Sequence, residues 1–128
     1  MPDPIEPSLT GMLCVLVVED EMLIALDLQL MLEDAGHRVL GPVGAVDKAL
    51  SLLDGARPDV VLLDLNLRGE LATPVAERLR SLGVPFIMTS ADTSVVRGDA
   101  AFEGAMEITK PVLQSDLLAA LDRVASGR

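Results

Sequence analysis

Short apolar runs alternate with longer, helix-like stretches five times along the chain, and this alternation constrains the fold more than any other feature. The apolar runs are continuous, as in strands buried on both faces of a parallel sheet. Strands that alternate with helices predict such a sheet, with helices on both sides. We therefore expect a three-layered, doubly wound α/β fold. The expected strands are residues 13–18, 38–40, 60–63, 84–88 and 105–108, and the expected helices are residues 21–35, 46–54, 73–82, 92–101 and 115–125.

Individual residues indicate where several of the helices begin and end. Thr73 suits the N-cap of the third expected helix, Pro74 its first turn and Gly83 its end. Ser115 suits the N-cap of the last helix. The stretch 92–101 is weakly helical, because its β-branched residues and glycine lower helix propensity.

The length of 128 residues fits one domain, and half of the residues are apolar, so the chain can bury a core. We expect a tail over residues 1–11 and one domain over residues 12–128. No run of roughly 18 apolar residues indicates a membrane span, and the first residues do not resemble a signal peptide. The sequence therefore predicts a cytoplasmic protein without membrane contacts.

The formal charge of −10 makes the chain strongly acidic. Nucleic-acid binders usually carry a basic patch, because they must attract phosphate groups. We therefore expect no direct contact with nucleic acid. Cys14 is the only cysteine and His37 the only histidine, which excludes an internal disulfide and a multi-histidine metal site.

Polar side chains follow four of the five expected strands. In open parallel sheets, functional groups gather at the carboxyl ends of the strands. These residues should therefore meet at one edge of the sheet. They are Glu19, Asp20 and Glu21 after the first strand, Asp64 and Asn66 after the third, Thr89 and Ser90 after the fourth, and Thr109, Lys110 and Pro111 after the fifth.

Glu19, Asp20 and Asp64 would place three carboxylates in one pocket, where they repel one another unless a cation lies between them. Carboxylates, water and a phosphoryl oxygen together suit Mg²⁺. Lys110 would neutralise a phosphoryl group from the other side. A carboxylate can also attack phosphorus and form an acyl phosphate. Taken singly, Asp20 could instead cap the following helix, and Asp64 could hydrogen-bond a turn.

These residues resemble the receiver domain of two-component response regulators. The similarity lies in segments 15–21, 60–67, 84–90 and 109–111, which occur in the family's order. It implies a flavodoxin-like fold, with a five-stranded parallel sheet of strand order 2-1-3-4-5. Residues 65–70 and 83–86 further resemble small single-domain bacterial receivers, so we expect a stand-alone receiver.

The resemblance implies a signalling domain rather than a dedicated enzyme. Asp64 would accept a phosphoryl group from a sensor histidine kinase, and slow self-dephosphorylation would follow. Mg²⁺ would be held by Asp64, by Asp20 directly, by Glu19 through water and by the backbone carbonyl of Asn66.

The resemblance also implies how the phosphoryl group is contacted. Lys110 would bind its oxygens, and the Lys110–Pro111 peptide bond would be cis. The Ser90 hydroxyl would act as the switch that follows the phosphoryl group, with Thr89 a less favoured candidate.

The chain departs from the family pattern at Glu107, three residues before Lys110, where many receivers carry a switching Tyr or Phe. We hypothesise that stretch 92–101 is mobile and becomes ordered on phosphorylation, although packing could fix it in either state. A downstream protein, or a second copy of the chain, would bind the face formed by residues 92–101, 105–108 and 115–125.

Three other functions remain open. A Mg²⁺-dependent phosphohydrolase with an Asp nucleophile usually needs a second acid two residues later, where this chain has Asn66. A pseudo-receiver would bind partners without phosphorylation, but every residue type of the pocket is present. A flavin or nucleotide binder would need a glycine-rich loop after the first strand, where residues 19–21 are acidic.

Overall fold

The computed structural model describes residues 11–91 and 99–127. Its elements lie close to the expected ones, with one additional hairpin and one 3₁₀ turn. In chain order they are β1 (Cys14–Val18), α1 (Met22–Asp34), β2 (Arg38–Val43), α2 (Val46–Gly55), β3 (Val60–Asp64), β4 (Asn66–Leu67), β5 (Glu70–Leu71), α3 (Thr73–Leu82), β6 (Phe86–Ser90), the 3₁₀ turn η2 (Ala100–Phe102), β7 (Met106–Thr109) and α4 (Gln114–Ser126).

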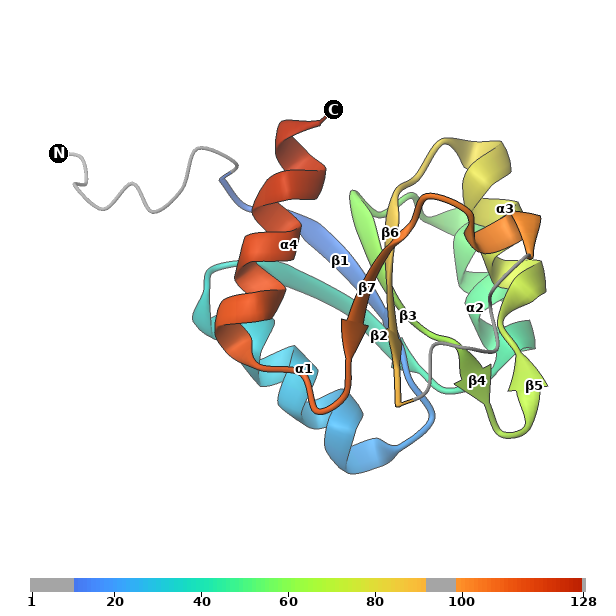
Figure 1. Cartoon of the computed structure of the whole chain (residues 1–128), viewed down its shortest axis with the longest axis horizontal. Helices are drawn as coiled ribbons and strands as arrows, with labels where there is room; N and C mark the ends of the chain where they lie inside the picture. Colours follow the sequence, from blue (N-terminus) through green and yellow to red (C-terminus); the bar gives the residue numbers. More distant parts are fainter. Residues whose placement is uncertain (1–10, 92–98, 128) are drawn as a thin grey trace, which may run out of the picture.

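Five strands form one parallel sheet in the order β2-β1-β3-β6-β7. Because β4 and β5 pair only with each other, this order is the predicted 2-1-3-4-5 arrangement. Helices α1 and α4 cover one face of the sheet, and α2 and α3 cover the other (Figure 1). The predicted doubly wound, flavodoxin-like α/β fold is therefore confirmed.

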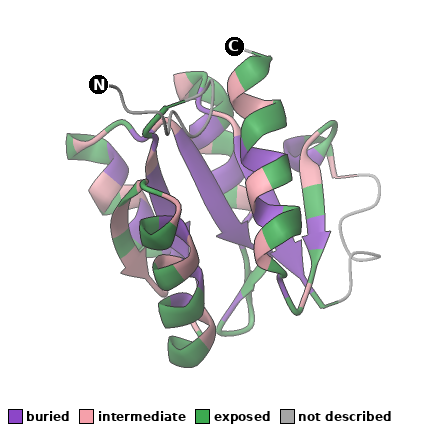
Figure 2. Cartoon of the chain, turned by 90° about the vertical axis from the view of Figure 1, so that its left-hand side faces the viewer, coloured by how far each residue is buried: buried purple, intermediate pink, exposed green. Residues whose placement is uncertain are grey.

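Successive residues of the central strands enter two different hydrophobic cores. In β1, Val15 and Val17 pack on the side of α1 and α4, whereas Leu16 and Val18 pack on the side of α2 and α3. The central strands are accordingly buried along their length, while the helices have both buried and exposed residues (Figure 2). This two-sided burial explains why the strands are continuously apolar.

Two predicted helix caps are wrong. Helix α3 begins at Thr73 with Ala72 as its N-cap, and the Thr73 hydroxyl donates to Asp99 Oδ2 at 3.2 Å. The Ala72 amide donates to the Leu65 carbonyl at 2.9 Å, so a contact with the preceding hairpin sets the start of the helix. Helix α4 likewise begins one residue before Ser115. The predicted roles of proline in the first turn of α3 and of glycine at its end are confirmed.

Other differences concern segments without a strong local pattern. β2 continues through the cis Gly41–Pro42 peptide bond to Val43, instead of ending at Leu40. Residues 92–98 lie outside the described residues, and so does most of the expected helix 92–101. Its end is not α-helical, because residues Ala100–Phe102 form a 3₁₀ turn in which Asp99 Oδ1 accepts from the Ala101 amide.

Within residues 11–91 and 99–127, no helix has both the length and the apolar character required to cross a membrane.

Candidate functional site

Four strand ends meet at one edge of the sheet. Glu19 and Asp20 follow β1 directly, and Asp64 is the last residue of β3. The strand register pairs Asp64 with Thr89, and the Lys110 amide donates to the Ser90 carbonyl at 2.9 Å. The parallel register therefore brings residues from four separate segments to the same edge.

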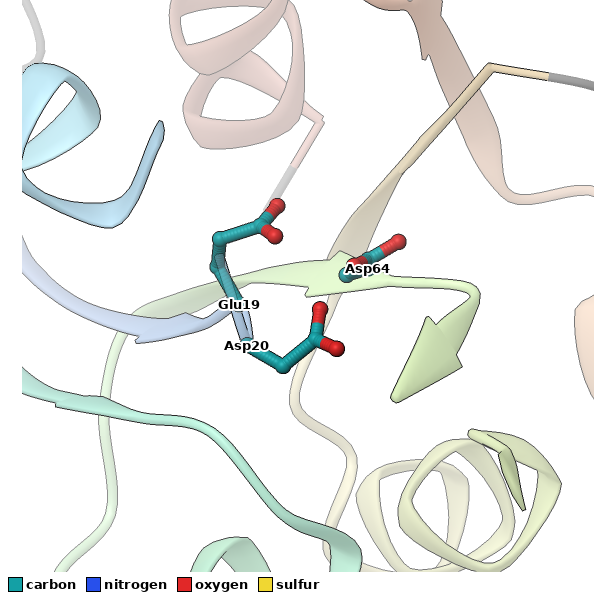
Figure 3. Close-up of side chains that lie close together, drawn as sticks. All are labelled: Glu19, Asp20 and Asp64. Atoms are coloured by element: carbon teal, nitrogen blue, oxygen red, sulfur yellow. The ribbon is translucent and has the colours of Figure 1, made fainter. Parts of the chain in front are cut away.

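Three carboxylates converge at this edge. The side chains of Glu19, Asp20 and Asp64 lie close together (Figure 3), and one carboxylate oxygen from each lies within 4.8 Å of those of the other two. Glu19 and Asp64 are buried, with 3% and 4% of their surface exposed. Burying such charges in one pocket is unfavourable unless positive charge compensates them.

Lys110, which follows the edge strand β7, supplies part of that compensation. Its Nζ lies 2.9 Å from Glu19 Oε1 and 3.3 Å from Asp64 Oδ2. Lys110 is therefore paired with two of the three acids at this strand end. The Lys110–Pro111 peptide bond is cis, as predicted.

The protein groups around Asp64 disfavour its ionised form. Burial, followed by the repulsion of Glu19, raises the pKa of Asp64 from 3.8 to about 7, although the Lys110 ammonium opposes this. Burial alone would lower the pKa of Lys110, but its contacts with Glu19 and Asp64 outweigh this and raise it. Lys110 thus stays charged, but its positive charge does not outweigh the burial and the repulsion by Glu19 that raise the pKa of Asp64.

The three carboxylates fit a divalent cation. Glu19 Oε1 is buried and makes no hydrogen bond with correct geometry in the described residues, despite its ion-pair distance to Lys110. A ligand set made only of carboxylate oxygens suits Mg²⁺ better than a soft metal. These residues could therefore hold such an ion.

The alternative roles of Asp20 as a helix cap and of Asp64 as a hydrogen-bond acceptor in a turn are only partly supported. Asp20 does not cap α1, whose N-cap is Glu21 without a side-chain cap. The Glu21 amide instead donates to Glu19 Oε2 at 3.0 Å. Asp64 does accept from the Asn66 amide, but the distance of 3.4 Å makes this a weak bond.

The remaining predicted site residues lie at the same edge. Thr89 and Ser90 are both buried at the end of β6. The Asn66 side chain is used in the β4–β5 hairpin, where its Oδ1 accepts from the Gly69 amide at 2.9 Å. The proposed metal contact of the Asn66 carbonyl stays a prediction.

A comparison with known protein families identifies the family of the chain. Residues 15–122 match the model of the response regulator receiver domain. The chain belongs to the response regulator receiver family. The match includes all four strand ends that form the pocket.

Individual relatives agree with this assignment. The receiver is 30% identical to the transcriptional regulatory protein PdtaR of Mycobacterium tuberculosis over 115 residues, which cover 88% of this chain and 56% of PdtaR. The solution structure of SdrG from Sphingomonas melonis has a TM-score of 0.76 and 34% identity, covering 90% of this chain and 97% of SdrG. The PhyR receiver domain of Erythrobacter litoralis has a TM-score of 0.81, with 24% identity and coverage of 91% and 92%.

The receiver spans about half the length of the curated relatives that it matches.

Sequence reasoning missed Arg68. This residue lies in the turn of the β4–β5 hairpin, and its amide donates to Asp20 Oδ2 at 2.9 Å. The one available signal was the Arg68-Gly69 pair between Leu67 and Glu70, which permits a two-residue hairpin turn.

Proposed function

We propose that this receiver is the phosphoacceptor of a two-component system, and that Asp64 takes a phosphoryl group from a sensor histidine kinase with Mg²⁺ bound. The observation that carries the proposal is the position of Asp64. Its carboxylate is buried between two further carboxylates and the Lys110 ammonium. This arrangement provides a nucleophile, a cation site and a fixed positive charge within one pocket.

Glu19, Asp20 and Asp64 would hold the ion, with the Asn66 carbonyl as a further ligand. When bound, Mg²⁺ supplies positive charge that neutralises phosphoryl oxygens and favours ionised Asp64.

In the transfer, an Asp64 carboxylate oxygen attacks phosphorus, and the bond from phosphorus to the donor histidine nitrogen breaks. The imidazole nitrogen leaves with the electron pair of that bond. Lys110, whose ammonium lies beside Asp64, neutralises phosphoryl oxygens and lowers the barrier by electrostatic stabilisation. The raised pKa of Lys110 supports this role, because the residue stays protonated.

Ser90 would report the phosphorylated state by turning its hydroxyl toward the new phosphoryl oxygens. The hydrogen bond from the Lys110 amide to the Ser90 carbonyl supports this assignment, because it fixes the two residues beside each other. The exposed side chain of Glu107 in β7 cannot reproduce the inward swing of an aromatic residue. Switching would therefore depend on Ser90 and the segment that follows it.

The kinase would dock on α1. Four large apolar side chains of this helix are exposed, namely Met22, Leu23, Leu26 and Leu30. Their helix begins two residues after Asp20, so a protein bound there can reach the pocket. Exposed apolar patches of this kind are typical of protein-binding surfaces. A downstream partner or a second copy would bind the face formed by residues 92–101, β7 and α4, of which residues 92–98 lie outside the described residues. The stand-alone and cytoplasmic character of the receiver stay predictions.

Intact mass spectrometry tests the proposal. The protein is incubated with acetyl phosphate, with and without Mg²⁺, beside the Asp64→Asn variant. We expect a gain of one phosphoryl group that requires Mg²⁺ and is absent in the variant. No gain with acetyl phosphate or with histidine kinases would contradict the proposal and favour a pseudo-receiver. Steady hydrolysis of a phosphomonoester would favour the phosphohydrolase.

A further inference from the structure

Arg68 lies at the tip of a hairpin that touches the acidic pocket. Arg68 and Gly69 form its two-residue turn and both have positive φ, 55° and 83°. The Arg68 amide donates to Asp20 Oδ2 at 2.9 Å. The hairpin thus connects the end of β3 to the loop after β1, and its backbone orients one of the three carboxylates.

The Arg68 side chain lies over the loop that follows β2. A Cβ built on Gly44 would lie 3.7 Å from the Arg68 terminal nitrogen Nη2 and 3.3 Å from the Cα of Asp20. The guanidinium is therefore close to the backbone that carries Asp20, at the rim of the pocket. Arg68 is exposed, and within residues 11–91 and 99–127 no carboxylate lies at ion-pair distance from its guanidinium.

We propose that Arg68 is an electrostatic steering residue, whose guanidinium draws anionic phosphodonors toward Asp64 while weakening the binding of Mg²⁺. The inference rests on the proposed function of Asp64. In this proposal, the Arg68 guanidinium at the rim is a second positive charge beside the Lys110 ammonium inside the pocket.

The charge balance explains why a rim cation matters here. The chain carries a net charge of −10 and three carboxylates at the pocket, so an approaching phosphate dianion is repelled. A local positive charge lowers that repulsion and increases the association rate, and salt screens the effect. The same charge repels a divalent cation. The Arg68 guanidinium should therefore raise the rate of reaction with the phosphodonor and lower the affinity for Mg²⁺.

The backbone and side-chain roles of Arg68 can be separated. Arg68→Ala keeps the amide that binds Asp20 and also keeps a non-glycine residue at positive φ, so the hairpin is equally strained. Arg68→Lys keeps the charge, and Arg68→Glu reverses it. Arg38→Ala is a matched control, because it removes one exposed arginine at the start of β2, at the opposite edge of the sheet.

The experiment measures two quantities for each variant: the affinity for Mg²⁺ by isothermal titration calorimetry, and the rate of phosphorylation by acetyl phosphate at low and high salt. We expect Arg68→Ala to bind Mg²⁺ about two- to fivefold more tightly and to react about two- to fivefold more slowly at low salt, as for one unit charge near a partly solvated pocket. Arg68→Glu should extend both effects, Arg68→Lys should restore both, and high salt should shrink them.

Equal rates and equal Mg²⁺ affinities in Arg68→Ala, Arg68→Glu and the native protein would overturn the inference. Equal effects in Arg38→Ala would also overturn it, because they would reflect net charge alone. If the native protein takes no phosphoryl group, the proposed function fails, and the Mg²⁺ affinities alone decide whether the Arg68 charge acts on the pocket.

Discussion

Replacing Asp64 with asparagine should stabilise the metal-free protein, and more so at pH 8 than at pH 5. The pocket raises the pKa of Asp64 from 3.8 to about 7. The folded state therefore holds a proton on Asp64 over a pH range in which the unfolded chain has lost it. By linkage, the contribution of Asp64 to stability falls as the pH rises from about 4 to about 7, and is constant above that range.

The size of the effect follows from the two pKa values. At pH 8 the raised pKa corresponds to about 4 kcal/mol of destabilisation, and at pH 5 to less than about 2 kcal/mol, at 1.36 kcal/mol per pH unit. These values are upper limits, because the titration of Asp64 is coupled to its interactions with Glu19 and Lys110. The asparagine side chain in Asp64→Asn has nearly the same shape as aspartate but carries no charge. Lys110 keeps its contact with Glu19 in this variant. We expect a gain of about 1–3 kcal/mol at pH 8.

Urea unfolding followed by circular dichroism, in EDTA at pH 5 and pH 8, measures this gain. The gain should be larger at pH 8 than at pH 5 by roughly 1–2.5 kcal/mol. Added Mg²⁺ should stabilise the native protein more than the variant, since only the native pocket has all three carboxylates. A variant less stable than the native protein at pH 8, or a gain independent of pH, would refute the reasoning.

Three further predictions concern the pocket, the core and the docking helix. Lys110→Met should destabilise the protein by about 3–5 kcal/mol in urea unfolding, because it leaves Glu19 buried without its cation; adding Glu19→Gln should recover part of the loss, and an additive double variant would contradict the pairing. Leu62→Ala should cost about 2–5 kcal/mol, because Leu62 is fully buried in β3; a loss below 1 kcal/mol would mean that this strand is not central to the core. Leu23→Asp should slow phosphotransfer from a histidine kinase but leave the reaction with acetyl phosphate unchanged, as Leu23 is 81% exposed; equal slowing of both reactions would argue against docking on α1.

The sheet and the pocket residues were predictable because each depends on a strong local pattern. The three central strands β1, β3 and β6 are runs of mostly apolar residues, and parallel pairing brings the strand ends to one edge whatever the lengths of the connections. Glu19, Asp20, Asp64 and Lys110 could therefore be grouped from their positions after strands.

The misplaced elements depend instead on contacts between distant residues. Thr73 has the side chain of an N-cap residue, but the N-cap of α3 is Ala72, whose amide donates to the Leu65 carbonyl. Thr73 is therefore already the first residue of the helix. The hairpin turn at Arg68 lacks the Asn-Gly or Asp-Gly signal that favours positive φ at both positions. The raised pKa of Asp64 could not be predicted either, because it results from burial and from the distances to its neighbours.

Chemical mapping of the phosphorylated residue tests the central claim most directly. The protein is phosphorylated by acetyl phosphate with Mg²⁺ and reduced with borohydride, which converts an aspartyl phosphate to homoserine, and its peptides are then sequenced by mass spectrometry. We expect homoserine at position 64 and at no other position, and none in a sample without Mg²⁺. Homoserine at Asp20 or another acidic residue, with Asp64 unmodified, would contradict the assignment of Asp64 as the phosphoacceptor.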